Sequence, residues 1–535
     1  MKKLYTIIAT ALIGGQLFAG GIVTNTNQSA QYVRMLSRNA SLGIDAVYFN
    51  PAGVARLSDG FHLSFSNQTI FQTKTITSTF PTLNNGEYIG DVKAPLFPSF
   101  FAAYKKGKVG VSFGFGPNGG GGSAEFSKGL ASFEKPVSML PSILAANEIP
   151  TDEYSADIYF NGSSIYWGSQ LNFTYEINEK FSVAAGVRMI NAKNTYQGHI
   201  RDIMINPTFT AIGADGSMMA APEFFTNMST YLTGVSNSAY GAAQGMQPLI
   251  SGGAGGLTFA QAEGAGIIDN ATRTQLEGGL LAMGSTQEQI DAMTITTAQA
   301  TYNGYGMGYA NSANEATANA AATSDVEVDA TQTGMAFTPI FSAMYSPNDK
   351  LDIAVKYELR TALTLTNDTK VDGSGMFKHD SSFRADIPAF LAVGVGYKLS
   401  DKFRTQLSFN TYFDKQADWG GKEDSVENNM WSVSLGMEYD ITEKLTGSIG
   451  YSRGNTGVGN GYQTDISYSN SSNTVGFGIQ FRPMENLAID LGALFVMYDD
   501  FTVESAANPA IGLPAYKTTY AKSLMDFAIG VTYNF

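Results

Sequence analysis

Apolar and polar residues alternate with a period of two along much of the chain. In the segment 163–177 the apolar side chains fall mostly on odd positions, such as Ile165, Trp167 and Leu171, and the even positions are mostly small or polar. The same alternation recurs in 351–366 and, less regularly, in several later segments. Successive side chains of a β-strand point to opposite faces, so the pattern predicts strands with one apolar face and one polar face.

The predicted strands are long enough to cross a lipid bilayer. Many run for roughly 10–16 residues, whereas soluble strands average roughly 5–6, and roughly 9–11 residues cross a bilayer at a tilt. We predict about fourteen strands, an even number as single-chain bacterial barrels have. They are 59–77, 96–105, 108–116, 162–177, 181–199, 334–346, 350–366, 384–399, 402–415, 429–441, 444–455, 471–482, 486–500 and 519–535.

Short polar turns alternate with longer connections between these strands. The short turns are 105–108, 176–181, 346–351, 399–403, 441–445 and 482–487. Short turns on one side and long loops on the other are typical of outer-membrane barrels, with the short turns in the periplasm. The chain ends in a last alternating strand that closes with Phe535. A C-terminal strand with a terminal aromatic residue resembles the signal that barrel-assembly machinery recognises, so we expect that machinery as a partner.

Composition favours a membrane barrel over a soluble β-sandwich. Charged residues make up 15% of the chain, against roughly 25% in globular proteins. The chain has 58 glycines, 34 phenylalanines and 27 tyrosines, which suits a wall that meets lipid and aromatic belts at two interfaces. It has no cysteine, as fits an envelope protein that avoids stray disulfides. The net charge of −14 argues against nucleic acid as a partner.

Residues 1–19 have the pattern of a secretory signal peptide. Lys2 and Lys3 form the positive end, an apolar run covers 4–15, and Ala19 is the predicted last residue removed. Leu17 departs from the small residue usual two positions earlier, so cleavage one residue to either side stays open. With the barrel pattern, the leader predicts a multi-pass β-barrel of the Gram-negative outer membrane, surrounded by lipid and lipopolysaccharide.

The segment 20–58 shows no sustained alternation, and 59–535 is the predicted barrel. A lumen of about fourteen strands is wider than side chains alone can fill, so this segment could plug it or hang in the periplasm. The run from Arg38 to Gly53 contains Phe49, Asn50, Pro51 and Ala52. It resembles the hatch of the FadL family, outer-membrane transporters of long-chain fatty acids and aromatic hydrocarbons. The resemblance implies a hatch-plugged, monomeric barrel, and the residue-level match is confined to this run.

In that family a kink in the third strand opens a lateral gap beside the hatch. The third predicted strand here carries Gly110, Gly114 and Gly116 and is followed by Pro117. Glycine weakens a strand ladder and allows a bend. We therefore expect a kink at Gly114, Gly116 and Pro117, although glycine-rich strand ends are also common where strands meet loops.

Two long extracellular loops are predicted, 117–160 and 201–333. In the second, Phe224, Phe225 and Met228 fall on one face of a helix expected to begin at Pro222, and Leu280 lies in another expected after Asp269. A capping box is predicted at Ser285–Glu288. These apolar residues could collect a hydrophobic ligand, since Met-rich surfaces adapt to varied apolar partners. They could equally pack a small core of the loop itself.

Inward-facing cations are candidates for contact with a ligand carboxylate. Strand parity predicts that Arg188, Lys356 and Arg360 face the lumen. Glu358 shares that face, so a structural ion-pair ladder is the alternative interpretation and the one we favour.

Catalytic and cofactor motifs are not evident. The chain has three histidines, and His199 near a strand end comes with no nucleophile motif. No phosphate-binding loop, zinc spacing or calcium loop occurs, so we expect no cofactor, no metal site and no enzymatic activity. The sequence favours passive transport of hydrophobic small molecules through a hatch-plugged barrel with lateral exit. A polar-solute porin, a loop-based adhesin and a barrel lipase are the alternatives.

Overall fold

The computed structural model describes residues 21–25, 27–509 and 512–535. The predicted signal peptide, 1–19, lies outside the described residues. The described chain divides into two compact units. A barrel unit contains residues 21–135, 158–200 and 326–535, and a helical unit contains 136–157 and 201–325.

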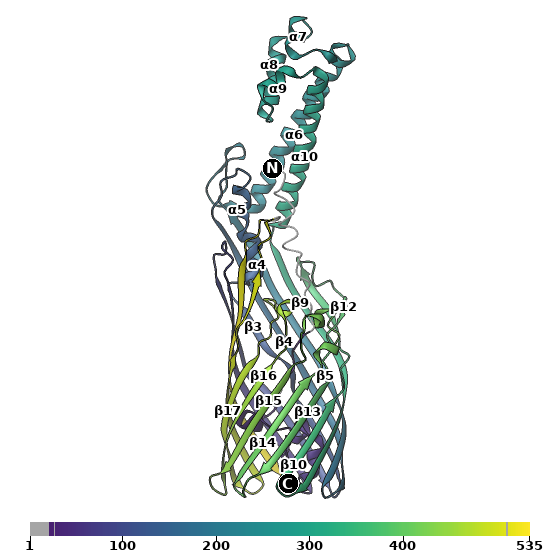
Figure 1. The fold of residues 1–535 in the computed structure, drawn as a ribbon, viewed down its shortest axis with the longest axis vertical. Coiled ribbons are helices and arrows are strands. Elements are labelled where there is room, and N and C mark those ends of the chain that lie inside the picture. The colour runs from purple at the N-terminus through teal and green to yellow at the C-terminus, as the bar shows by residue number, and fades with distance from the viewer. Residues whose placement is uncertain (1–20, 26, 510–511) are drawn as a thin grey trace. The chain divides into compact units, whose positions relative to one another are not determined.

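The barrel unit is a closed antiparallel β-barrel of 14 long strands, as the alternation predicted (Figure 1). Strand β20 pairs with β1 from His62–Asn534 to Ser78–Thr518, and this pairing closes the ring. The long strands are β1 (Gly60–Ser78), β2 (Glu87–Lys106), β3 (Val109–Phe126), β4 (Tyr154–Asn178), β5 (Phe181–Ile205), β9 (Val326–Asn348), β10 (Leu351–Glu358), β13 (Phe390–Lys398), β14 (Phe403–Tyr412), β15 (Trp431–Asp440), β16 (Leu445–Asn455), β17 (Ser472–Met484), β18 (Leu487–Tyr498) and β20 (Tyr516–Asn534).

All six predicted short turns join neighbouring long strands, but several strand ends differ from the prediction. Strand β3 continues to Phe126, β4 begins at Tyr154 and β5 continues to Ile205, so the connections 127–153 and 206–325 are shorter than the predicted loops. The predicted strand 350–366 is wrong at its far end. There β10 stops at Glu358, and a separate strand, β11 (Thr364–Asp372), pairs with β9.

The outer wall of the barrel is apolar and its inner wall is polar. On β1 the side chains of Phe61 and Phe65 are exposed, whereas Ser64, Ser66 and Gln68 are buried. Exposed apolar side chains at every second position continue on the other long strands, as at Phe527 and Ile529 of β20, for example. A closed barrel with an apolar outer band is stable in lipid, so this unit is a transmembrane barrel of the outer-membrane type.

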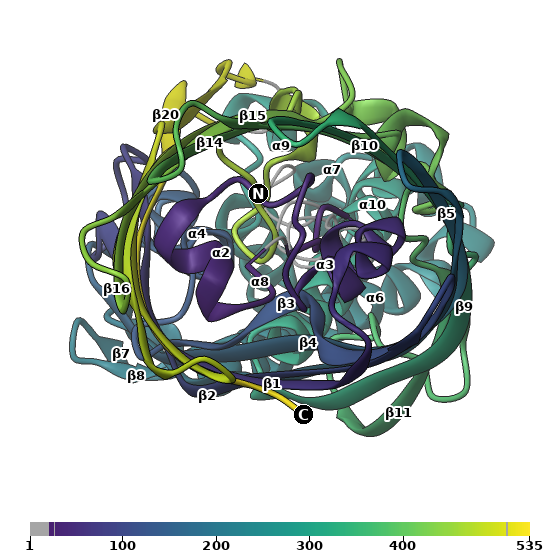
Figure 2. The same ribbon diagram turned by 90° about the horizontal axis from the view of Figure 1, so that it is seen from below.

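The N-terminal segment, residues 21–25 and 27–58, lies inside the ring of strands (Figure 2). It contains the helices α2 (Ala30–Met35) and α3 (Ala46–Phe49) and the 3₁₀ helix η1 (Pro51–Arg56). The Ser29 side chain accepts a hydrogen bond from the Tyr32 N–H and so caps α2. Helix α2 contacts β15, β16, β17, β18 and β20, so it rests on one side of the lumen.

Glycines on the inner wall let the backbone of α2 approach the strands closely. A Cβ atom added to Gly450 would lie 1.8 Å from the Met35 carbonyl oxygen, and one added to Gly436 would lie 2.5 Å from the same atom. Gly476 and Gly492 make similar approaches to Val33 and Arg34. We call these four residues the glycine shelf. Any side chain there would displace α2, so this part of the lumen is shaped to hold the N-terminal segment.

The helical unit is built on two long helices, α6 (Ala221–Ser251) and α10 (Ile295–Ala322), which pack against each other. Shorter helices α7 (Phe259–Gly264), α8 (Asn270–Ala282) and α9 (Gln287–Ala292) lie between them in sequence. Asp269 caps α8, where the sequence predicted a helix start. The predicted capping box at Ser285–Glu288 is one residue early, because Thr286 and Gln289 form the box. None of the helices among the described residues is long and apolar enough to span a membrane.

Candidate functional site

A buried ion cluster lies on the inner wall where β5 and β10 face the lumen. The Arg188 guanidinium donates two hydrogen bonds to the Glu358 carboxylate, at 2.6 and 2.9 Å. The Lys356 ammonium donates to the same carboxylate at 2.8 Å. All three side chains are almost fully buried. The predicted ion-pair ladder therefore contains Arg188, Lys356 and Glu358, and it carries two positive charges against one negative charge.

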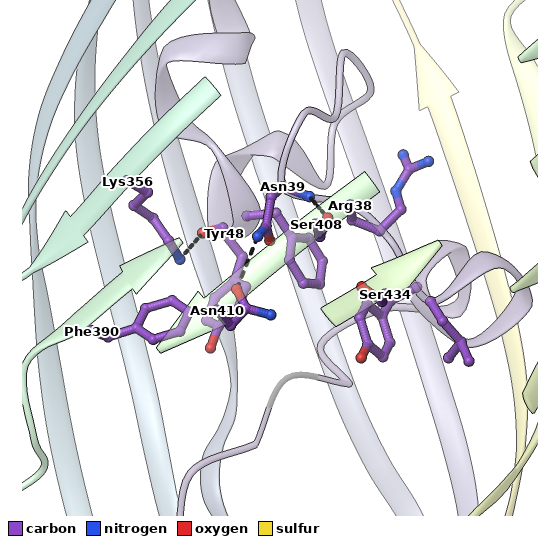
Figure 3. Close-up of a pocket in the computed structure, with 11 residues that line it drawn as sticks. Arg38, Asn39, Tyr48, Lys356, Phe390, Ser408, Asn410 and Ser434 are labelled. Atoms are coloured by element: carbon purple, nitrogen blue, oxygen red, sulfur yellow. Dashed lines mark hydrogen bonds between the residues drawn. The ribbon is translucent and has the colours of Figure 1, made fainter. Parts of the chain in front are cut away.

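Aromatic rings of the lumen enclose this cluster. The Lys356 ammonium lies 4.6 Å from the ring centre of Tyr48 and 5.1 Å from that of Phe390, and it donates to the Tyr48 carbonyl oxygen at 2.9 Å (Figure 3). The Arg188 guanidinium lies 4.8 Å from the Tyr48 ring centre. Burial raises the pKa of Tyr48, so its hydroxyl stays protonated at neutral pH. The excess positive charge thus meets aromatic faces, which attract cations.

A small cavity adjoins the cluster between the N-terminal segment and the wall. Figure 3 shows that its lining combines aromatic rings from both sides with polar groups of the strands. The lining residues are Tyr32, Leu36, Arg38, Asn39, Tyr48, Phe49, Lys356, Phe390, Ser408, Asn410 and Ser434. Aromatic and aliphatic side chains thus lie next to charged and polar ones around this cavity. Of the residues singled out from the sequence, Phe49 and Lys356 line this cavity, and Arg188 lies beside it through Tyr48.

The Asn50-Pro51-Ala52 run is held to the wall through its backbone. The Thr174 hydroxyl donates to the Pro51 carbonyl and the Ser182 hydroxyl to the Ala52 carbonyl, both at 2.8 Å. The Ala52 N–H donates to the Ser342 hydroxyl at 2.7 Å. Next to this run, Gly53 has no room for a side chain, because an added Cβ would lie 2.4 Å from the Ser41 carbonyl oxygen. These contacts fix the run against β4, β5 and β9.

Helix α2 is fixed to the opposite wall by buried charges. The Arg34 guanidinium bonds Asp490 at 2.8 Å and also pairs with Glu438. Within the segment, Arg38 forms a two-fold hydrogen bond with Asp45 at 2.6 and 2.8 Å. Breaking a buried pair leaves an uncompensated charge, which costs about 3–5 kcal/mol. The N-terminal segment is therefore anchored on both sides of the lumen.

The ladder between β2 and β3 is interrupted. The two strands pair from Lys106–Val109 to Phe100–Phe115, and pairing resumes only at Val92–Ala124 and Asp91–Glu125. Residues 93–99 and 116–123 face each other without ladder bonds. Pro95, Pro98 and Pro117 fall in this stretch, and proline has no N–H to donate. We call this stretch the β2–β3 gap.

The N-terminal segment replaces β2 as the partner of β3 along the gap. The Asn25 N–H donates to the Asn118 carbonyl at 3.1 Å, and the Gly120 N–H donates to the Val23 carbonyl at 2.7 Å. The Gln28 side chain donates to the Pro117 carbonyl at 2.7 Å. The interruption of the ladder therefore lies directly beside the N-terminal segment.

The irregular part of β3 begins later than the glycines expected to form a kink. Its pairing with β4 shifts register between Pro117 and Gly119 and again between Gly120 and Gly122. Gly114 pairs regularly on both sides, with Phe101 and Gln170, and its missing side chain makes room for Val47. Gly116 keeps its β4 partner and lacks a β2 partner.

The ion cluster does not include the remaining residues singled out from the sequence. Phe224, Phe225 and Met228 of α6 are buried, and Leu280 of α8 is buried in an apolar cluster of the helical unit. Arg360 follows the end of β10, where strand parity no longer applies. It lies 3.4 Å from Asp386 and is half exposed, and the structure does not bring it to Arg188.

The connection between β14 and β15 contains a buried carboxyl group, which makes the stability of this connection depend on pH. Asp414, in the 3₁₀ helix η4 (Asp414–Gln416), is 1% exposed, and burial raises its pKa from 3.8 to about 7. Between about pH 4 and pH 7, Asp414 therefore keeps its proton while residues 414–426 are folded and loses it when they unfold. We expect the stability of residues 414–426 to fall by about 1.4 kcal/mol for each unit of pH between roughly 4 and 7.

Hydrogen exchange of residues 414–426, corrected for the intrinsic rate, measures this loss. Asp414→Asn should abolish it, because asparagine can still accept the Met430 N–H bond of 2.8 Å without a charge. Burial lowers the pKa of nearby Lys422 to about 8, so its titration falls outside this range. Equal protection of the unaltered protein at pH 5 and pH 7.5 would contradict the prediction.

Comparison with known proteins gives a match in structure alone. No protein-family model and no curated protein matches the chain. A FadL homologue of Pseudomonas aeruginosa is 11% identical over 96% of this chain and 100% of its own, with a TM-score of 0.54. A deletion mutant of the monoaromatic hydrocarbon channel TodX is 10% identical over 95% and 99%, with a TM-score of 0.50. The toluene transporter TodX of Pseudomonas putida is 11% identical over 92% and 94%, with a TM-score of 0.48. The chain therefore has the fold of the FadL-type outer-membrane transporters.

Proposed function

We propose that this protein carries hydrophobic small molecules passively across the outer membrane, and that they leave the barrel sideways through the β2–β3 gap. The observation that carries the proposal is the position of the gap beside a lumen filled by an anchored segment. A filled lumen suits a porin poorly, since a polar solute needs a continuous water path. The structural neighbours, a FadL homologue and a monoaromatic hydrocarbon channel, support the same function.

The physical chemistry of an apolar ligand supports a lateral route. Moving one buried CH₂ group into water costs about 0.8 kcal/mol, so a long hydrocarbon would not leave readily into an aqueous space. The side chain of Leu96, in the gap, is 76% exposed on a wall that faces lipid. An opening at this place would deliver a hydrocarbon directly to the membrane.

The ion cluster is the proposed site for a polar head group. The two positive charges of Arg188 and Lys356 face the single negative charge of Glu358. The adjoining cavity has the Tyr48 and Phe390 rings at its edge. A carboxylate would balance the excess charge, and the rings would contact the first carbons of the chain. The same rings would accept an uncharged aromatic ligand. This role requires no catalytic group and no cofactor, and we propose that the barrel works as a monomer assembled through its C-terminal strand.

Two disulfides across the gap test the lateral route. The positions Ser99 and Gly116 lie at one end, with 3.3 Å between the Ser99 Cβ and an added Cβ, and Ala94 and Gly122 lie at the other, with 3.5 Å. These separations are near the roughly 3.5–4.5 Å of natural disulfides, and the chain has no other cysteine. The variant S99C/G116C/A94C/G122C is to be inserted into lipid vesicles and its uptake of radiolabelled laurate measured.

We expect oxidation to reduce uptake at least about tenfold, a rise in barrier of about 1.4 kcal/mol, and reduction by dithiothreitol to restore it. The unaltered protein, treated with the same reagents, is the control. Equal uptake in the oxidised and reduced states would contradict lateral exit. Ion conductance of the unaltered protein through an open pore would favour a porin instead.

A further inference from the structure

Two lysines stand side by side on the inner wall, away from the ion cluster. Lys74 of β1 pairs in register with Lys522 of β20. Both side chains are partly buried. They point to the lumen, because they lie an even number of residues from the buried Gln68 of β1 and the buried Asp526 of β20. The Cα atoms of paired residues in an antiparallel ladder are about 4.5–5.5 Å apart, so the two lysine side chains leave the backbone from neighbouring points on the same face.

Neither lysine has a counter-ion among the residues that the structure describes. Lys74 makes no ion pair and no hydrogen bond with any of them, and Lys522 makes no ion pair. The Lys522 ammonium donates to the Tyr468 carbonyl at 2.6 Å and lies 4.4 Å from the Tyr468 ring centre. Like charges directly opposite each other destabilise a strand pair, and partial burial adds to the cost. An anion between them would remove both penalties.

The carboxylates nearest to this part of the lumen form no ion pair with either lysine among the described residues. Asp465 accepts the Ser132 N–H and the Tyr520 hydroxyl, and Asp499 pairs with Arg453. Asp526, two lumen-facing positions from Lys522 along β20, is buried with neither carboxylate oxygen hydrogen-bonded to a described residue, and it forms no ion pair with Lys522. The positive charge of the lysine pair is therefore free to act on a ligand.

An apolar cluster adjoins the lysine pair. Ile76 and Tyr520 form the next lumen-facing pair of the same ladder, and they pack with Tyr468. Partly buried apolar side chains, among them Ile466 and Val503, pack against this cluster. A ligand with an anionic head and a hydrocarbon chain matches two positive charges next to an apolar surface.

The pair lies toward the end of the barrel opposite the short turns. The outward neighbours of Lys74 are Thr73 and Thr75, whereas Phe61, Phe65 and Phe71 form the outward face earlier on β1. The outer wall thus changes from apolar to polar at this level, as it does at the surface of a bilayer. A ligand that enters from outside would meet this pair before it reaches Arg188.

We propose that Lys74 and Lys522 form an anion-binding site that takes the carboxylate of an amphipathic hydrocarbon on its way into the lumen. The site deepens the proposed transport function and rests on it. It is a first binding site on the route, distinct from the Arg188–Lys356–Glu358 cluster. It favours charged ligands over uncharged ones.

Equilibrium dialysis of the full purified protein in amphipol tests this site with two probes, laurate and dodecanol, which share a chain length and differ in charge. The variant K74Q/K522Q removes both charges, K74R/K522R keeps them, and K193Q removes an exposed lysine of β5. We expect K74Q/K522Q to bind laurate about tenfold or more weakly, as loss of charge-assisted hydrogen bonds does, and dodecanol within roughly twofold of the unaltered protein. K74R/K522R and K193Q should bind both probes normally.

Several outcomes would overturn the site, and they separate it from the transport function. Unchanged laurate binding in K74Q/K522Q, with both probes bound by the unaltered protein, would overturn the lysine site alone. Equal loss of laurate and dodecanol would show that the substitutions act through packing. Binding of inorganic phosphate that requires the lysines, while laurate binding does not, would assign them to a free anion. No saturable binding of either probe to the unaltered protein would overturn the transport function as well.

Discussion

Glu358→Ala is expected to destabilise the barrel by about 3–5 kcal/mol, the usual cost of breaking a buried ion pair. Glu358 is the single carboxylate that neutralises both Arg188 and Lys356, at 2.6 and 2.8 Å. Without it, two buried cations would face each other with no counter-charge. Urea unfolding in lipid vesicles, followed by tryptophan emission, measures the change in the free energy of unfolding.

Two further variants identify the cause of that loss. Glu327→Ala removes an exposed carboxylate of β9 and should change the free energy of unfolding by less than about 0.5 kcal/mol. The triple variant R188M/K356M/E358M removes the whole cluster and should cost less than Glu358→Ala alone, because no charge is left buried. A triple variant less stable than the single one would contradict the electrostatic account and indicate that packing or hydrogen bonds dominate.

Gly450→Val should unseat helix α2 and open the lumen to ions. A Cβ at this position would lie 1.8 Å from the Met35 carbonyl oxygen, a backbone atom that cannot rotate away. Both partners must shift, and the Arg34 pairs with Glu438 and Asp490 would be strained with them. We expect stable ion conductance in planar bilayers from Gly450→Val and little from the unaltered protein.

Gly454→Val is the matched control for this prediction. Gly454 lies on the same strand as Gly450 and faces the lumen like it, four residues further along. The nearest atom to a Cβ added there is the Ser472 hydroxyl oxygen, at 3.6 Å. It should leave the barrel closed. A sealed Gly450→Val barrel with unchanged stability would show that the glycine shelf does not hold the N-terminal segment in place.

The barrel could be predicted from the sequence because alternation is a local property. Each strand shows its own apolar face, as 163–177 does, and each short turn shows its own polar residues. The count of long strands followed from these local signals. The error at the end of β10 has a physical reason: Leu363 and Leu365 continue the alternation, but they belong to a separate segment that pairs with β9 and packs in an apolar cluster of its own.

The contacts of the N-terminal segment within the lumen could not be predicted, because they join residues far apart in sequence. The glycine shelf is an example: Gly450 and Gly476 read as ordinary strand glycines until the backbone of α2 is placed against them. Their lumen-facing parity, shared by Gly436 and Gly492, was a usable signal of a close neighbour inside the barrel. Tyr48 also gave no signal, since its role depends on cations more than 100 residues away along the chain.

Native mass spectrometry of the detergent-purified protein, with its ligands extracted and identified, tests the central claim most directly. If the barrel carries hydrophobic molecules past an anchored segment, a fatty acid or similar apolar compound should co-purify. Disruption of Asn50-Pro51-Ala52 or of Phe49 should remove it, because these residues hold or line the cavity. A protein that retains no apolar ligand and conducts ions through an open pore would contradict the claim and would be a porin.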